Sequence, residues 1–167
     1  LCIQHKVSPM RALWLIKAPA IRKAYEGAFA ALARKHRVTV VAGSVPLAFP
    51  DRPADVFNAC CVFAPDGKMQ VVARKVYLVD LEKASGLDLS AGTIEEYHAY
   101  RMPQATIGTL VCADAWHPEL AKRLVEQGAE VLLQVSANPE VWSPNHREGW
   151  NKSLFSRVQE LNVYGVQ

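Results

Sequence analysis

The hydrophobic positions along the chain follow two different periods, and each period predicts a different kind of element. Apolar residues recur every three or four positions from Ala20 to His36, after Pro19, which predicts a helix. Its inner face is predicted to carry Ile21, Ala24, Tyr25, Ala28 and Leu32. Residues 1–18 contain an apolar patch without a clear period, so the pattern predicts no element there.

Short runs of apolar and β-branched residues predict buried strands elsewhere. They span residues 38–42, 56–63, 69–75, 107–113, 131–135 and 163–166. Pro65-Asp66-Gly67 is a turn sequence, so residues 56–75 are predicted to form a β-hairpin. Helices are predicted over residues 118–127 and 147–161. Strands that alternate with helices favour an α/β fold, in which helices cover a mixed sheet. No repeat or linker divides the chain, so residues 1–167 are predicted to form a single domain.

Composition and charge narrow the classes of function. The 167 residues are 50% apolar and 21% charged. The net charge is only +3, so there is no electrostatic reason to expect binding to nucleic acid or to an anionic membrane. No apolar run reaches the roughly 18 residues of a membrane span, and no secretory signal is seen. Four cysteines are too few for a disulfide scaffold, so we expect a reducing, cytoplasmic location. Because the chain starts at Leu1 without Met, we also expect a preceding segment to be missing.

Cys112 is the leading candidate nucleophile. It ends an apolar strand and precedes the helix that starts near Pro118, so its side chain is expected at the open edge of a sheet. Backbone N–H groups at such a place can hold an oxyanion, and the positive end of a helix favours a thiolate. From position alone, a structural core cysteine is an equally good interpretation. Cys60 and Cys61 lie in mid-strand and are interpreted as buried apolar thiols.

A nucleophilic cysteine needs a base or a cation beside it. One class of partner is Lys75, at the end of the hairpin, with Glu82 seven residues later. A lysine can stabilise a thiolate or a developing oxyanion, and a carboxylate can move a proton. The other class is a histidine, and the candidates are His36, His98, His117 and His146. Cys2 and His5 lack a second ligand pair, so no metal site is predicted.

Two motifs resemble those of the nitrilase, or carbon–nitrogen hydrolase, superfamily. Arg74-Lys75-Val76-Tyr77-Leu78 is similar to its lysine motif, and the segment from Gly108 to Leu120 is similar to its cysteine motif. The strand Phe57-Asn58-Ala59 resembles the strand that carries a family asparagine, and Arg157 to Asn162 matches a late helix. The resemblance covers roughly residues 20–167 and implies an α-β-β-α sandwich, with mixed sheets covered by helices.

The resemblance implies acyl transfer without a metal or organic cofactor. Cys112 is then the nucleophile, Lys75 stabilises the tetrahedral intermediate, and Glu82 is the second acidic residue, with Asp80 and Glu95 as alternatives. The three site residues are expected to converge on one cleft. The implied substrate is a small amide, carbamoyl compound or nitrile, whose C–N bond is cleaved through a cysteine thioester. Trp116 and Trp142 follow two of the strands and are candidates to line the substrate pocket.

The chain departs from the family pattern in three places. The general-base glutamate upstream of the first helix has no counterpart, because Glu26 lies inside that helix. Tyr77 replaces a histidine common in the lysine motif, and the chain stops at Gln167, where the family continues. These departures predict an incomplete domain that is inactive alone.

Four interpretations of function and one of assembly remain open. The leading one is a carbon–nitrogen hydrolase, and the runner-up is a non-catalytic subunit or binding scaffold with the same fold. An N-acyltransferase and a Cys–His peptidase rank lower. The resemblance also implies a homo-oligomer formed through helices 118–127 and 147–161, whose many apolar residues favour a partner.

Overall fold

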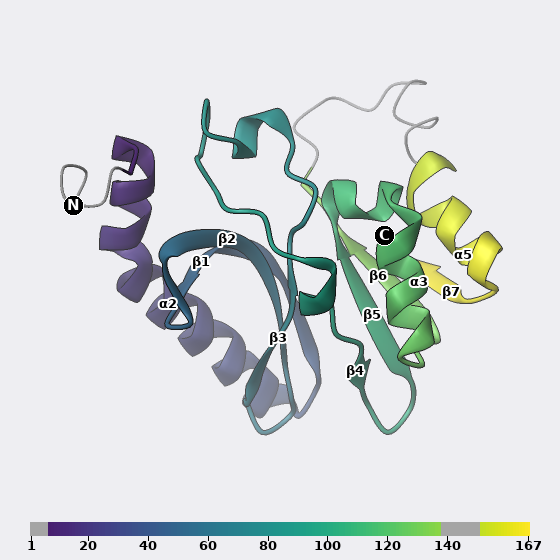
Figure 1. The fold of residues 1–167 in the computed structure, drawn as a ribbon. Helices are drawn as coiled ribbons and strands as arrows, with labels where there is room; N and C mark the ends of the chain where they lie inside the picture. Colours follow the sequence, from purple (N-terminus) through teal and green to yellow (C-terminus); the bar gives the residue numbers. More distant parts are fainter. Residues whose placement is uncertain (1–6, 138–150) are drawn as a thin grey trace. The chain divides into compact units, whose positions relative to one another are not determined.

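The structure, a computed structural model, describes residues 7–137 and 151–167. Its contacts divide the chain into two compact units, Leu1–Gly92 and Thr93–Gln167. Each unit combines a β-sheet with helices, as Figure 1 shows, so the predicted α/β class is confirmed.

The first unit is a long helix packed on an antiparallel sheet (Figure 1). Helix α2 spans Pro9–His36. Strands β1 (Val40–Phe49), β2 (Arg52–Phe63) and β3 (Met69–Arg74) follow in the order β1-β2-β3. Strands β2 and β3 pair antiparallel, which confirms the predicted hairpin of residues 56–75.

Helix α2 begins earlier than the pattern predicts. The side chain of Ser8 accepts a hydrogen bond from the backbone N–H of Arg11, and Pro9 occupies the first turn, where its missing N–H is not needed. The expectation that the helix starts after Pro19 is therefore wrong, because Pro19 lies inside it. Ser8-Pro9 was the available signal, since serine before proline is typical of a helix start.

The first two strands are also longer than predicted. Strand β1 continues through Pro46 to Phe49, beyond the predicted end at residue 42. It lies at an edge of the sheet, so a proline that lacks an N–H is tolerated there. Pro53 lies at the start of β2, another position that accepts proline. Proline is therefore a poor loop signal in this segment.

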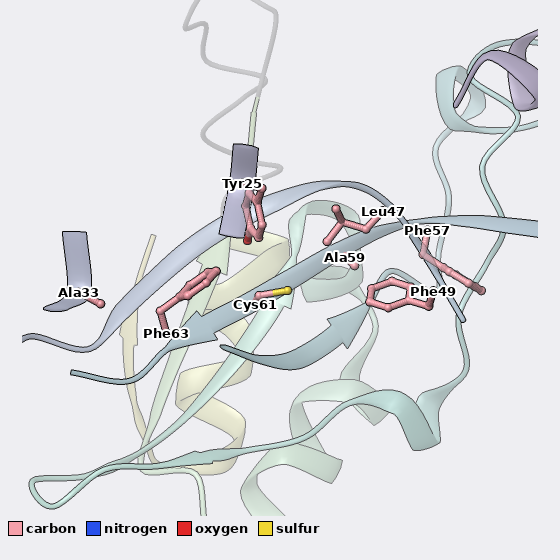
Figure 2. Close-up of a cluster of buried hydrophobic side chains, with 8 residues drawn as sticks. All are labelled: Tyr25, Ala33, Leu47, Phe49, Phe57, Ala59, Cys61 and Phe63. Atoms are coloured by element: carbon pink, nitrogen blue, oxygen red, sulfur yellow. The ribbon is translucent and has the colours of Figure 1, made fainter. Parts of the chain in front are cut away.

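The core of the first unit lies between α2 and the sheet (Figure 2). It consists of eight buried residues: Tyr25, Ala33, Leu47, Phe49, Phe57, Ala59, Cys61 and Phe63. The predicted inner face of the helix is only partly right, because Ala24, Ala28 and Leu32 are exposed. Ile21, Tyr25, Phe29 and Ala33 instead face the sheet at intervals of four residues. The aromatic residues account for this orientation of the helix, since the rings of Tyr25 and Phe29 both pack against the ring of Phe63.

The second unit has a mixed sheet in the order β4-β5-β6-β7. The strands are β4 (Tyr100–Arg101), β5 (Thr106–Val111), β6 (Val131–Val135) and β7 (Tyr164–Val166). Strands β5, β6 and β7 are parallel, and β4 pairs antiparallel with β5. The sequence predicted the three parallel strands but missed β4, which is too short to show a period.

Helix α3 (Pro118–Glu126) confirms the prediction for residues 118–127. The predicted helix 147–161 lies partly outside the described residues, and its described part is a π turn, Asn151–Phe155, followed by α5 (Ser156–Leu161). Leu120, Leu124 and Leu154 on these helices are buried within the chain itself. These three leucines therefore need no partner copy to cover them. Among the described residues, no helix is long and apolar enough to cross a membrane.

Candidate active site

Lys75 and Glu82 form a buried ion pair in the first unit. Lys75 directly follows β3, and Glu82 ends the 3₁₀ turn Asp80–Glu82. The Lys75 Nζ lies 2.5 Å from the Glu82 Oε2, and the two residues are only 1% and 6% exposed. A lysine is almost never buried unless it is paired, so this carboxylate is what makes the position of Lys75 tenable.

Glu82 is in turn held by two more donors. Its Oε1 accepts a 2.7 Å hydrogen bond from the Asn58 Nδ2, and its Oε2 accepts one of 3.0 Å from the backbone N–H of Val79. Asn58 lies on β2, and its carbonyl accepts from the backbone N–H of Lys75. Asn58 thus contacts both members of the pair, a role that the sequence analysis did not assign to it. The signal in the sequence was the resemblance of the strand Phe57-Asn58-Ala59 to the one that carries an asparagine in the family.

The segment that carries Glu82 is tied to the start of α2. The Arg11 Nη2 donates to the Asp88 Oδ1 at 2.9 Å, and its Nε donates to the Asp88 carbonyl at 3.1 Å. The Trp14 Nε1 donates to the Leu87 carbonyl at 3.0 Å. Residues for which the sequence predicted no element therefore position the loop that bears the candidate acid.

The other end of this loop is anchored at Asp55. Burial raises the pKa of the Asp55 carboxyl, but hydrogen bonds from Ser90 and Arg52, helped by the charge of Arg11, outweigh it and lower the pKa overall. The Ser90 Oγ lies 2.6 Å from the Asp55 Oδ1, and the Arg52 Nε lies 2.9 Å from its Oδ2. The carboxylate therefore holds residue 90 in place at neutral pH.

Cys112 lies in the second unit, directly after β5. It starts the 3₁₀ turn Cys112–Trp116, and its backbone is left-handed, with φ +51°. The strand predicted over residues 107–113 therefore ends at Val111. Few residues other than glycine adopt this conformation, and such strain clusters at active sites. The Cys112 side chain is half-buried, whereas Cys60 and Cys61 are fully buried, as predicted.

The turn after Cys112 is held by side chains from three other segments. The Gln134 Nε2 on β6 donates to the Cys112 carbonyl at 3.0 Å. The Arg157 Nη1 on α5 donates to the Trp116 carbonyl at 3.2 Å. The Tyr97 hydroxyl donates to Asp114, and both residues are fully buried. No motif in the sequence marks these side chains for such roles.

The remaining predicted site residues are placed as follows. Trp116 ends the cysteine turn and is 57% exposed, whereas Trp142 lies outside the described residues. His117 precedes α3, with its Nδ1 4.0 Å from the Glu119 Oε1. His36 ends α2, and His98 is exposed. His146 lies outside the described residues. The assignment of substrate-lining and histidine roles stays a prediction.

Each of the two units therefore contributes its own reactive groups. The first unit supplies a buried ammonium beside a carboxylate that can accept a proton. The second supplies a thiol on a strained turn at the end of a parallel strand. Among residues 7–137 and 151–167, no cluster of three or more metal-ligating side chains occurs.

Comparison with known proteins identifies the family. The Carbon-nitrogen hydrolase family model matches residues 10–163. The chain is 26% identical over 139 residues to the omega-amidase NIT2 of Mus musculus, which covers 80% of this chain and 48% of that protein. It is 28% identical over 160 residues to the deaminated glutathione amidase of Synechocystis sp., covering 91% and 57%. A crystal structure of a carbon-nitrogen hydrolase from Helicobacter pylori has the same fold, with a TM-score of 0.73 at 20% identity, over 96% of this chain and 56% of that one.

The chain spans about half the length of the curated relatives it matches. The match nevertheless includes the lysine segment and the cysteine segment, which the sequence analysis selected. The predicted resemblance and the predicted fold class are both confirmed. This chain belongs to the carbon–nitrogen hydrolase family of the nitrilase superfamily.

Proposed function

We propose that the protein of which this chain is a part hydrolyses the C–N bond of a small amide, with Cys112 as the nucleophile. The observation that carries the proposal is the backbone of Cys112, which is left-handed at the junction between a parallel strand and a turn. Strain of this kind persists only where the surrounding structure holds it, and it is typical of a residue presented for reaction. The family supports the class of reaction.

Each candidate residue has one role in the proposed reaction. The Cys112 thiolate attacks the amide carbon, and the C–N bond of the tetrahedral intermediate breaks to release ammonia or an amine. A water molecule then cleaves the thioester to release the acid and regenerate the thiol. Lys75 stabilises the oxyanion of the intermediate. Glu82 holds the Lys75 side chain in place and is the carboxylate that accepts and returns protons.

The relatives favour an amide over a nitrile or a carbamoyl compound. The two curated relatives reported above are named as amidases. We therefore propose a small carboxamide as the substrate, with Trp116 as a candidate contact because its indole is largely exposed at the end of the cysteine turn. Trp142, the homo-oligomer and the cytoplasmic location remain predictions from the resemblance and the composition.

The test uses the full-length protein of which this chain is a part, called the full chain below, and a panel of small aliphatic amides, with ammonia release as the assay. Cys112→Ala should abolish turnover. Lys75→Ala should slow it by at least about 100-fold, the scale of one lost oxyanion donor. Lys68→Ala is the matched control, because Lys68 is a neighbouring lysine whose side chain is 85% exposed, and it should leave turnover unchanged.

Three results would point to another function. Near-normal turnover in Lys75→Ala, together with loss of turnover in His98→Ala or His146→Ala, would favour a Cys–His mechanism. Binding of an amide without turnover in the full chain would favour a non-catalytic subunit. Transfer of the acyl group to an added amine in place of water would favour an acyltransferase. The proposed roles also require the Lys75 ammonium within about 8 Å of the Cys112 sulfur, which a crystal structure of the full enzyme measures.

A further inference from the structure

The backbone at Cys112 costs free energy that the turn itself does not offset. A non-glycine residue in a sparsely populated backbone region is destabilised, and it persists only when its surroundings over-determine its conformation. Cys112 has φ +51°, and its neighbours in the turn are alanine, aspartate, alanine and tryptophan, none of which relieves this strain as glycine does. The contacts that hold the conformation must therefore come from elsewhere in the unit.

Among the described residues, Gln134 is the one whose side chain hydrogen bonds to the backbone of Cys112. It lies on β6, which pairs in parallel with β5, and its register partner Leu110 is two residues before the cysteine. Its Nε2 donates to the Cys112 carbonyl at 3.0 Å, and the residue is only 8% exposed. A buried strand position normally carries an apolar residue, so a glutamine there calls for a role that its amide performs.

The hydrogen bond acts on the geometry of the nucleophile. The peptide group between Cys112 and Ala113 is planar, so a donor that fixes the Cys112 carbonyl also fixes the rotation of that whole group. That rotation is ψ of Cys112, which together with φ sets the backbone from which the thiol projects. Without the donor, the turn is free to relax towards a right-handed backbone, which redirects the side chain.

We propose that Gln134 is a positioning residue that holds Cys112 in its reactive backbone conformation through the Cys112 carbonyl. Arg157 fixes the far end of the same turn through the Trp116 carbonyl, and the buried pair of Tyr97 and Asp114 fixes its middle. The turn is thus held at both ends and in the centre. Of these contacts, the one from Gln134 acts on the cysteine itself. The role in turnover rests on the proposed function, whereas the role in thiol reactivity does not.

The test compares Gln134→Met with Gln127→Met in the full chain. Both changes replace a glutamine whose amide hydrogen bonds to backbone within the second unit. The amide of Gln127 meets the backbone of Tyr97 and Ala99, and it does not contact the Tyr97 hydroxyl that donates to Asp114. We expect Gln134→Met to lower kcat for amide hydrolysis by about 10-fold or more, as small misplacements of a reacting group do, while KM stays within twofold. Gln127→Met should leave kcat unchanged even if it lowers the thermal midpoint as much.

A second readout needs no substrate. The rate at which iodoacetamide alkylates Cys112, followed by mass spectrometry of its peptide, should fall at least about threefold in Gln134→Met and stay unchanged in Gln127→Met. Equal kcat and equal alkylation rates in folded Gln134→Met and wild type would overturn the proposal. So would a decrease of the same size in both variants, because that would reflect stability alone.

Two further variants keep the result decisive. If Gln134→Met does not fold, Gln134→Asn takes its place, because it keeps a buried amide but is one methylene too short to reach the Cys112 carbonyl. The same decreases in kcat and in alkylation rate are expected. A kcat and an alkylation rate equal to those of the wild type would contradict the proposal. If Cys112→Ala retains full amide turnover, the proposed function fails. The alkylation rates in the Gln134 and Gln127 variants then still decide whether Gln134 positions the thiol.

Discussion

The buried pair of Lys75 and Glu82 makes a stability prediction that can be worked from its contacts. The Glu82 carboxylate accepts from the Lys75 ammonium at 2.5 Å, from the Asn58 amide at 2.7 Å and from the Val79 N–H at 3.0 Å. Glu82→Leu therefore leaves the buried Lys75 cation without its partner, and it leaves two part-buried donors, on Asn58 and Val79, without their acceptor. Breaking a buried pair by removing one partner costs about 3–5 kcal/mol, and we expect this decrease in the free energy of unfolding.

Removing both charges should cost much less than the two single changes added together. Lys75→Met alone leaves the carboxylate buried without its cation, and its expected cost is again about 3–5 kcal/mol. The double variant Lys75→Met/Glu82→Leu leaves no uncompensated charge. Its remaining cost is that of the two unmet donors on Asn58 and Val79, about 1–3 kcal/mol each at most. The double variant should therefore lose less stability than the two single variants added together, by a difference that is clearly measurable.

Urea unfolding of the full chain, followed by circular dichroism, measures all four free energies. The exposed pair of Lys83 and Asp80 is the matched control, because it lies in the same segment with an N–O distance of 2.8 Å and both side chains are largely in solvent. The same cycle there should give no measurable coupling. Additive losses in the Lys75–Glu82 cycle would refute the reasoning, because they would mean that the pair does not act as a buried unit.

Two further predictions concern the cysteines and the glycines. At pH 8, iodoacetamide should alkylate Cys112 at least about 10-fold faster than Cys60 or Cys61. Burial raises the pKa of Cys61 to about 11 and raises the pKa of Cys60 as well, so few thiolates form at these two residues. Equal alkylation rates by peptide mass spectrometry would contradict this prediction. Gly108→Ala should lower the free energy of unfolding by about 1–3 kcal/mol, since a Cβ there lies 2.9 Å and 3.0 Å from two leucine side chains. Gly27→Ala, in a helix with nothing within 4 Å, should raise it by about 0.5–1 kcal/mol, and the opposite ranking in urea unfolding would count against the packing argument.

The sequence by itself determined the elements that depend on local pattern. Strands β5 and β6, the hairpin of β2 and β3, and helix α3 all lie where apolar runs, turn residues and a first-turn proline predict them. Cys112 was selected by the same local logic, as a thiol between a strand and a helix, and the two motifs then indicated the family. Such signals are readable because the period of a strand or helix and the chemistry of a turn are properties of neighbouring residues.

The tertiary structure alone decided which polar groups meet. Arg11 and Asp88 are 77 residues apart, and Gln134 is 22 residues from Cys112. A glutamine in a strand or an arginine in a helix gives no local sign of its partner, because that partner is set by which segments the fold packs together. The left-handed backbone of Cys112 has the same origin, since no local preference of cysteine favours it. The sequence therefore indicates Cys112 as a candidate nucleophile, and side chains from β6, α5 and Tyr97 determine how its turn is held.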